Sequence, residues 1–198
     1  IGLLAGVLGA VKPNSTVDYL TLVVALVGIS LPSFVIGTLL LMVFPVWLGV
    51  GSVGAWGRPQ DALLPALTLS LPFAAYIARL TRMGMIEALN TDYVRTARAK
   101  GLRENVVMFK HVLRNAINPL ISSFGFAFSS LLSGALIVEN IMNYPGLGSL
   151  IYQGFLREDR FLVLASITLS CVMLILGNLV ADILLAKCDP RIRLEAKS

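Results

Sequence analysis

Charged residues are scarce in this sequence. Of its 198 residues, 14% are charged and 57% are hydrophobic, whereas ordinary globular chains have about 25% charged and about 45–50% apolar residues. The mean hydropathy of +0.83 reflects the same excess. A composition this poor in charge argues against a soluble enzyme, a disordered chain and a secreted disulfide scaffold. It predicts a protein whose main solvent is the lipid bilayer.

Cysteine and histidine are nearly absent. The chain has two cysteines and one histidine. Cys171 lies in an apolar run and Cys188 beside a charged tail, so we expect no disulfide between them. A metal site needs several ligands, whereas His111 stands alone near Lys110 and Arg114. We therefore predict no metal site in this chain.

Catalytic and nucleotide-binding motifs are also missing. The Gly-Lys pair of a Walker A loop never occurs, and there is no G-x-S-x-G nucleophile element. Residues 49–54 match G-x-G-x-x-G, but a dinucleotide site needs a strand before this motif and a helix after it. We predict instead a tight turn with Trp47 and Trp56 at the membrane interface. No catalytic residues are expected.

Long charge-free runs are what the sequence has in abundance. A membrane-spanning helix needs about 20 mostly apolar residues, and prolines inside such runs, Pro32 among them, predict kinked helices. The chain opens at Ile1 without a methionine, so we expect the carboxyl-terminal part of a longer, all-α membrane protein. The predicted spans are 19–44, 62–78, 115–138 and 161–181, with a partial one over 1–11. Gly2 and Gly6 are expected to let two helices approach closely.

Basic residues fall on alternate linkers between these spans. Thirteen of the 16 lie at Lys12, in the loop 79–114 and in residues 187–198, whereas the linkers 45–60 and 139–160 hold three. By the positive-inside rule, the loop 79–114 and the tail 188–198 are cytoplasmic, and the other two linkers face outward. This leaves residues 1–187 as one transmembrane domain.

The loop 79–114 has a helical pattern of its own. Asn90, Thr91 and Asp92 are amino-capping residues, residues 93–100 predict a short helix, and Gly101 suits a left-handed carboxyl cap. A second helical run covers residues 104–114. Three interpretations remain open at this point: a solvated basic loop, a contact with lipid headgroups, or a helix that docks on a cytoplasmic partner.

Three stretches carry a family resemblance. Residues 93–102 (YVRTARAKGL), followed by 111–115 (HVLRN), resemble the conserved cytoplasmic loop of ABC-importer permeases. Residues 139–148 (ENIMNYPGLG) and 189–193 (DPRIR) narrow this to the dipeptide, oligopeptide and nickel permease B family. The general pattern has a Glu-Ala-Ala group and a later Pro; Arg95-Thr96-Ala97 stands in place of the first, and the Pro is missing. That departure is itself similar to the peptide-permease branch.

The resemblance implies a polytopic type I ABC-importer permease with a cytoplasmic coupling helix. Such a helix fits a cleft in an ATPase subunit, and ATP-driven closure of two ATPases tilts the permease between inward-open and outward-open states. Gly101→Asp is then expected to leave the protein inserted but to uncouple ATP hydrolysis from transport. The residues expected to couple to the ATPase are Tyr93, Arg95, Thr96, Ala97, Arg98, Gly101, Leu102 and Arg103.

A second expected site lies in the linker 139–160. It has an outer gate or structural role, and for Glu139 such a role is favoured over direct contact with substrate. Its residues are Glu139, Asn143, Pro145, Gly146 and Gly148.

The resemblance also implies partners and a location. The expected partners are a homologous second permease, two ABC ATPases that bind ATP and magnesium, an extracytoplasmic solute-binding protein and membrane lipid, but no nucleic acid. No cofactor is expected on this chain, and the location is a bacterial or archaeal plasma membrane. Transported substrates would be dipeptides or oligopeptides, with nickel or glutathione as alternatives. An ion-coupled secondary transporter is disfavoured because no carboxylate lies in mid-span.

Overall fold

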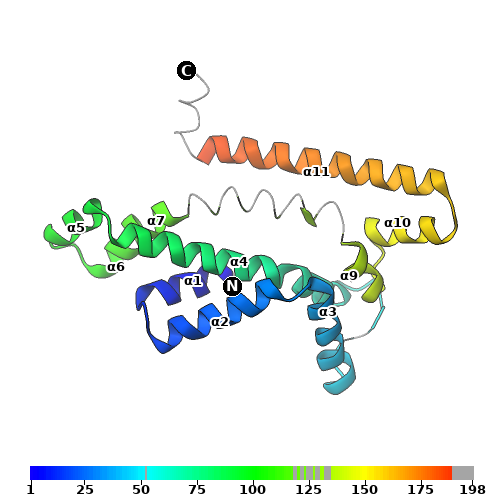
Figure 1. Ribbon diagram of the computed structural model, residues 1–198, viewed down its shortest axis with the longest axis horizontal. Helices are drawn as coiled ribbons and strands as arrows, with labels where there is room; N and C mark the ends of the chain where they lie inside the picture. The colour runs from blue at the N-terminus through cyan, green and yellow to red at the C-terminus, as the bar shows by residue number, and fades with distance from the viewer. Residues whose placement is uncertain are drawn as a thin grey trace. The chain divides into compact units, whose positions relative to one another are not determined.

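Every regular element in the described part of the chain is a helix, which confirms the all-α class (Figure 1). The computed structural model describes residues 1–51, 53–117, 120, 123, 127, 130, 131 and 135–188. Segments η1 and η3 are π-helical and η2 is a 3-10 helix. The helices are α1 (Gly2–Val11), α2 (Thr16–Ser30), α3 (Ser33–Leu41), η1 (Met42–Trp47), η2 (Pro59–Ala62), α4 (Leu63–Leu89), α5 (Asp92–Ala99), α6 (Glu104–Val106), η3 (Val107–Val112), α7 (Leu113–Ala116), α9 (Leu136–Ile141), α10 (Leu147–Leu156) and α11 (Arg160–Cys188).

Two helices of the described residues are long and apolar enough to cross a membrane, Pro59–Leu89 and Arg160–Val180. They contain the predicted span 62–78 and nearly all of 161–181. A third candidate is a broken span made of two helical segments. The first is α2, Thr16–Ser30, and the second is α3 continued by η1, Ser33–Trp47. The helix expected over 19–44 is therefore broken at Pro32, because proline lacks the N–H group and disfavours helical backbone in the residue before it. Half of the predicted span 115–138 lies outside the described residues.

Helix α4 continues beyond the predicted end of its span. It runs to Leu89, so the first eleven residues of the predicted loop 79–114 are helical. Their sequence, RLTRMGMIEAL, is rich in residues with high helix propensity and contains no proline. We call the remaining residues, 90–114, the docking segment, after the contact with a partner that the sequence resemblance led us to expect. It is attached directly to a long helix rather than to a flexible linker.

The chain divides into two compact units. Unit 1 comprises residues 1–30, 73–124 and 183–198, and unit 2 comprises 31–72 and 125–182. In unit 1, α1 lies against α4 at its two glycines: a Cβ on Gly6 would be 2.5 Å from the Ala78 carbonyl oxygen, and one on Gly2 would overlap the carbonyl of Ala74. The close helix approach expected at Gly2 and Gly6 is confirmed, and α4 is the partner.

The apolar core of unit 1 joins α1, the end of α4 and the docking segment. Met85, Val94, Val107 and Val112 are completely buried. Residues this tightly enclosed fix the relative positions of the helices that carry them. The buried members of this cluster are Val7, Ala10, Met85, Ala88, Val94, Ala97, Val107, Met108, Val112 and Ala116.

Unit 2 is built around α3, the first half of α4, α9 and α10. Gly37 of α3 lies where a Cβ would be 3.1 Å from the Thr68 side chain and 3.2 Å from that of Met142. The glycine-rich loop that follows η1 has positive φ at Gly49 and Gly51, +64° and +85°, which agrees with the predicted turn. The sequence predicted no dinucleotide site in this loop. Residue 52 lies outside the described residues.

Candidate functional site

Helix α5 is fixed to unit 1 by one face and exposes the other. Val94 and Ala97, three residues apart, are buried in the apolar cluster, as the 3.6-residue period of a helix requires. Tyr93, Arg95 and Thr96 are exposed. Asp92 in the first turn and Arg98 in the last complement the helix dipole. A short helix that would be marginal alone is thus held by packing.

The start of α5 differs from the expected side-chain cap. Thr91 occupies the N-cap position, but its side chain does not cap α5. Its hydroxyl instead donates to the carbonyl oxygen of Ala88, and the side-chain amide of Asn90 donates to the carbonyl of Ile86 at 2.9 Å. Both side chains therefore close the last turn of α4. The sequence signal marked the right place but the wrong helix terminus.

The end of α5 is a Schellman turn at Gly101, which confirms the predicted left-handed cap. Gly101 has φ +75°. Its N–H donates to the carbonyl of Arg98 at 2.9 Å, and the N–H of Leu102 donates to that of Ala97 at 3.4 Å. This pair of hydrogen bonds satisfies carbonyls that a helix end leaves open. No atom lies within 4 Å of a Cβ built on Gly101, so the backbone conformation, not lack of space within the chain, favours glycine.

Arg98 and Glu104 form an ion pair across this turn. The Arg98 Nε donates to Glu104 Oε2 at 3.2 Å, and Nη2 donates to Oε1. The hydrogen bonds from Arg98 lower the pKa of the Glu104 carboxyl below its ordinary value, and the same bonds raise the pKa of Arg98. Both side chains are about half exposed or more, at 46% and 57%, so solvent screens the attraction. The pair links the end of α5 to the start of α6.

The predicted coupling residues lie on two sides of α5 and its turn. Ala97 packs in the apolar cluster of unit 1, whereas Tyr93 and Leu102 are each 40% exposed. Val94 and Glu104 were not among the predicted site residues, although Val94 is completely buried and holds α5 in the apolar cluster. Its position three residues before Ala97 was the available signal. The remaining predicted residues, Arg95, Thr96, Arg98, Gly101 and Arg103, are exposed.

The second predicted set lies in α9, in the turn that follows it and in the first turn of α10; we call residues 135–149 the Glu139 turn. Glu139 is 7% exposed. Its Oε1 accepts the N–H of Ala135 at 2.9 Å, and its Oε2 accepts the N–H of Ser149, in the first turn of α10, at 2.8 Å. A carboxylate at this place satisfies free N–H groups at the helix amino end and interacts favourably with the dipole.

Two glycines make room for this carboxylate. A Cβ on Gly146 would overlap the Glu139 carboxylate, and one on Gly148 would overlap the backbone of Leu136. Their role is close approach. Pro145 precedes the N-cap residue of α10. The two glycines of the PGLG sequence thus leave space for the carboxylate of Glu139, which belongs to the same motif.

Asn143 and Tyr144 connect the Glu139 turn to the glycine-rich loop within unit 2. Asn143 has φ +50°, and its side-chain amide donates to the carbonyl of Gly54 at 3.3 Å. The rings of Tyr144 and Trp56 meet edge to face, with centroids 4.5 Å apart, an arrangement favoured by aromatic quadrupoles. The two segments therefore form one structure, which the sequence reading treated as separate linkers.

Comparison with known proteins identifies related chains. The family model described as "Binding-protein-dependent transport system inner membrane component" matches residues 2–194. The oligopeptide transport system permease protein AppB of Bacillus subtilis (strain 168) is 41% identical over 197 residues, which cover 94% of this chain and 62% of AppB. The glutathione transport system permease protein GsiC of Escherichia coli (strain K12) is 44% identical over 195 residues, 97% of this chain and 63% of GsiC. The chain thus spans somewhat less than two thirds of these relatives' length.

Proposed function

This chain belongs to the family of binding-protein-dependent transport system inner membrane components, and from this membership we propose that it is the permease part of an ATP-driven peptide importer. It contributes to the translocation path and transmits the work of ATPase subunits. The chain itself is non-catalytic in this proposal, since ATP and magnesium are bound by the partners.

The observation that carries the proposal is the two-faced packing of α5. Its inner face, Val94 and Ala97, is buried in the core of unit 1, while Tyr93, Thr96 and Leu102 remain exposed around the turn. A short helix so presented suits insertion into a groove of a partner protein. Exposed arginines on the same segment add polar contacts. In this proposal, the partner that provides the groove is a cytoplasmic ATPase.

The other proposed partners follow from the family. A type I importer of this kind needs a homologous second permease, two ATPases and an extracytoplasmic solute-binding protein. The exposed apolar side chains of α11, such as Leu164, Ile175 and Leu179, suit lipid or the second permease equally. The docking segment and the tail would face the cytoplasm, and the linkers 45–60 and 139–160 would face outward.

The proposed substrates are peptides. The two relatives named above are described as an oligopeptide and a glutathione permease, and glutathione is itself a small peptide. We propose dipeptides to oligopeptides as the main class and glutathione as the alternative within it. Binding measurements on the solute-binding protein that works with this chain, with peptides, glutathione and nickel as probes, separate these cases.

Site-directed cross-linking tests the proposed docking. In the full-length importer, with Cys171 and Cys188 replaced by serine, Thr96→Cys should cross-link to the ATPase. The matched control is Tyr152→Cys on α10, also an exposed position (41%), which should not. Equal cross-linking of both positions, or of neither, would overturn the docking proposal.

Uptake in proteoliposomes distinguishes the rival transporter class. Labelled peptide should accumulate with ATP and the binding protein present. Accumulation driven by an ion gradient without ATP would instead identify a secondary transporter.

A further inference from the structure

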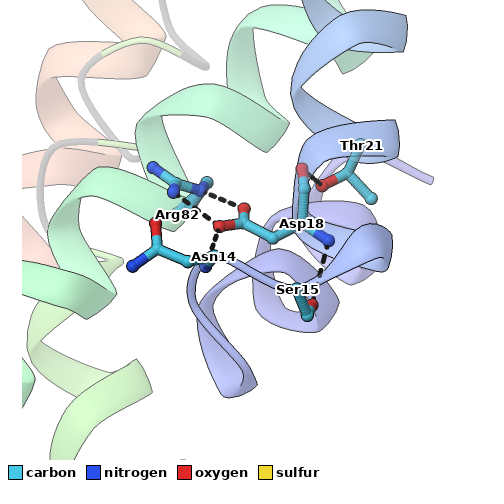
Figure 2. A network of polar contacts seen from close by, with 5 residues as sticks. All are labelled: Asn14, Ser15, Asp18, Thr21 and Arg82. Atoms are coloured by element: carbon cyan, nitrogen blue, oxygen red, sulfur yellow. Dashed lines mark hydrogen bonds and ion pairs between the residues drawn. The ribbon is translucent and has the colours of Figure 1, made fainter.

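A buried ion pair joins the start of α2 to helix α4 (Figure 2). Asp18, in the first turn of α2, has a side chain that is 1% exposed, and Arg82 of α4 is 18% exposed. The guanidinium engages both carboxylate oxygens: Nε donates to Oδ1, and Nη2 donates to Oδ2 at 2.8 Å. This bidentate geometry is the most specific that arginine offers.

The surrounding hydrogen bonds fix the α1–α2 turn around Asp18. The backbone N–H of Asn14, a residue with φ +61°, donates to Asp18 Oδ2 at 2.8 Å. Ser15 Oγ accepts the N–H of Asp18 at 3.2 Å, and the Thr21 hydroxyl donates to the carbonyl of Asp18 at 2.9 Å. Figure 2 shows these residues converging on Asp18 from the turn and from α2. Both carboxylate oxygens of Asp18 thus accept hydrogen bonds from within the protein.

The pair lies about one helical turn from the core that holds the docking segment. Arg82 precedes the fully buried Met85 by three residues on α4, and Met85 belongs to the same apolar cluster as Val94 of α5. On the α1 side, a Cβ on Gly9 would be 3.2 Å from Asp18 Oδ1 and 3.5 Å from Arg82 Cδ. Close contact therefore continues from the ion pair through α1 and α4 to α5.

A buried ion pair of this kind serves position more than stability. Desolvation of the two charges offsets much of their attraction, so such pairs are weak evidence for stability. Their geometric demands instead fix one arrangement, because any other leaves a buried charge without its partner. Here the arrangement that is fixed is that of α1 and α2 on the end of α4 that carries α5.

We propose that Asp18 and Arg82 are positioning residues that lock the α1–α2 hairpin to the end of α4, so that these helices and α5 move as one body during transport. The inference rests on the proposed function, because it assumes that an ATPase moves α5. The pair would stay formed in both nucleotide states. Its loss would let α5 move without carrying α1 and α2 along.

Spin-label distances test the rigid body without disturbing the pair. Val23→Cys in α2 and Met83→Cys in α4 are both exposed, 57% and 54%, and the native cysteines are replaced by serine. In the assembled full-length importer, the distance between labels should be the same with and without ATP. A distance that changes with nucleotide would overturn the proposal.

Variants test whether the lock matters for coupling. Arg82→Gln and Asp18→Asn should lower the amount of peptide transported per ATP hydrolysed about fivefold or more, the scale of a typical coupling interaction, and should broaden the label distance. Arg82→Lys, which keeps the charge, should recover part of the loss. Arg79→Gln removes the same charge from an exposed position one turn away and should leave the ratio unchanged.

The readout separates this inference from the function on which it rests. Assembly and the thermal unfolding midpoint of each variant complex show whether the complex folds. The ratio of peptide transported to ATP hydrolysed measures coupling separately. If ATP drives uptake and Thr96→Cys cross-links to the ATPase, but Arg82→Gln and Asp18→Asn retain the wild-type ratio, the lock is disproved and the permease assignment stands. If neither cross-linking nor ATP-driven uptake occurs, the assignment itself fails.

Discussion

Gly101 shows how a single residue sets the geometry of the docking segment. Its φ of +75° is in the left-handed region, which costs an ordinary L-residue about 1–2 kcal/mol and a β-branched residue more. We therefore expect Gly101→Val to distort the turn and to reduce peptide transport per ATP, measured in proteoliposomes. Gly101→Asn should retain most of it, since asparagine tolerates this conformation better than other residues.

The comparison of these two variants identifies why glycine is needed. The space around Gly101 is open within the chain, so an asparagine side chain meets no atom of its own unit. An asparagine variant as defective as the valine variant would contradict the conformational explanation. It would indicate instead that an ATPase packs closely against the backbone at Gly101, where any side chain would interfere.

At the scale of elements, the turn between α5 and α6 should depend on pH through Glu104. Hydrogen bonds from Arg98 lower the pKa of this carboxyl in the folded protein below its ordinary value of 4.5. A lowered folded-state pKa contributes stability that is fully present above the unfolded value and is lost as the pH falls through the folded one. Amide hydrogen exchange in residues 98–106, corrected for intrinsic rates, should therefore show loosening only below about pH 4.5.

Glu104→Gln is the control for this effect. It removes the titrating carboxyl, so the amide hydrogens of residues 98–106 should exchange faster at neutral pH. Their exchange should also no longer change with pH below about 4.5. High salt should weaken protection of the wild type at neutral pH, because the pair is exposed and screened. Acid loosening that persists in Glu104→Gln would assign the effect to another group.

Local elements were predictable because their signals lie close together in the sequence. The helix expected over 93–100 occurs at Asp92–Ala99, and Gly101 follows it as a left-handed cap. The signals that place it lie within about three turns. The break at Pro32 has an equally local cause, although its extent was underestimated.

Pairings between distant residues were not predictable in the same way. Asp18 and Arg82 are 64 residues apart, and neither charge carries a mark of its partner. Glu139 was expected to be structural or gating, but its acceptance of the Ser149 N–H depends on how α9 turns into α10. The length of α4 was missed because the end of apolar character was read as the end of the helix, whereas helix propensity continues through Leu89.

At the scale of the whole molecule, the distribution of charge predicts orientation. Thirteen of 16 basic residues lie at Lys12, in 79–114 and in 187–198, and such residues are retained on the cytoplasmic side during insertion. In the full-length protein without native cysteines, Lys100→Cys should react with a membrane-impermeant maleimide only in inverted vesicles. Val53→Cys, in the linker 45–60 and 59% exposed, should react only in right-side-out preparations.

A membrane-permeant maleimide provides the control, since it should label both positions in either preparation. Labelling of Lys100→Cys from the outside would reverse the orientation and place α5 beyond the reach of a cytoplasmic ATPase. The docking proposal and the positive-inside argument would then fail together. With the expected result, the shortage of charge that makes the chain a membrane protein and the clustering of what charge it has become parts of one arrangement: the basic residues hold the docking segment on the side where ATP is available.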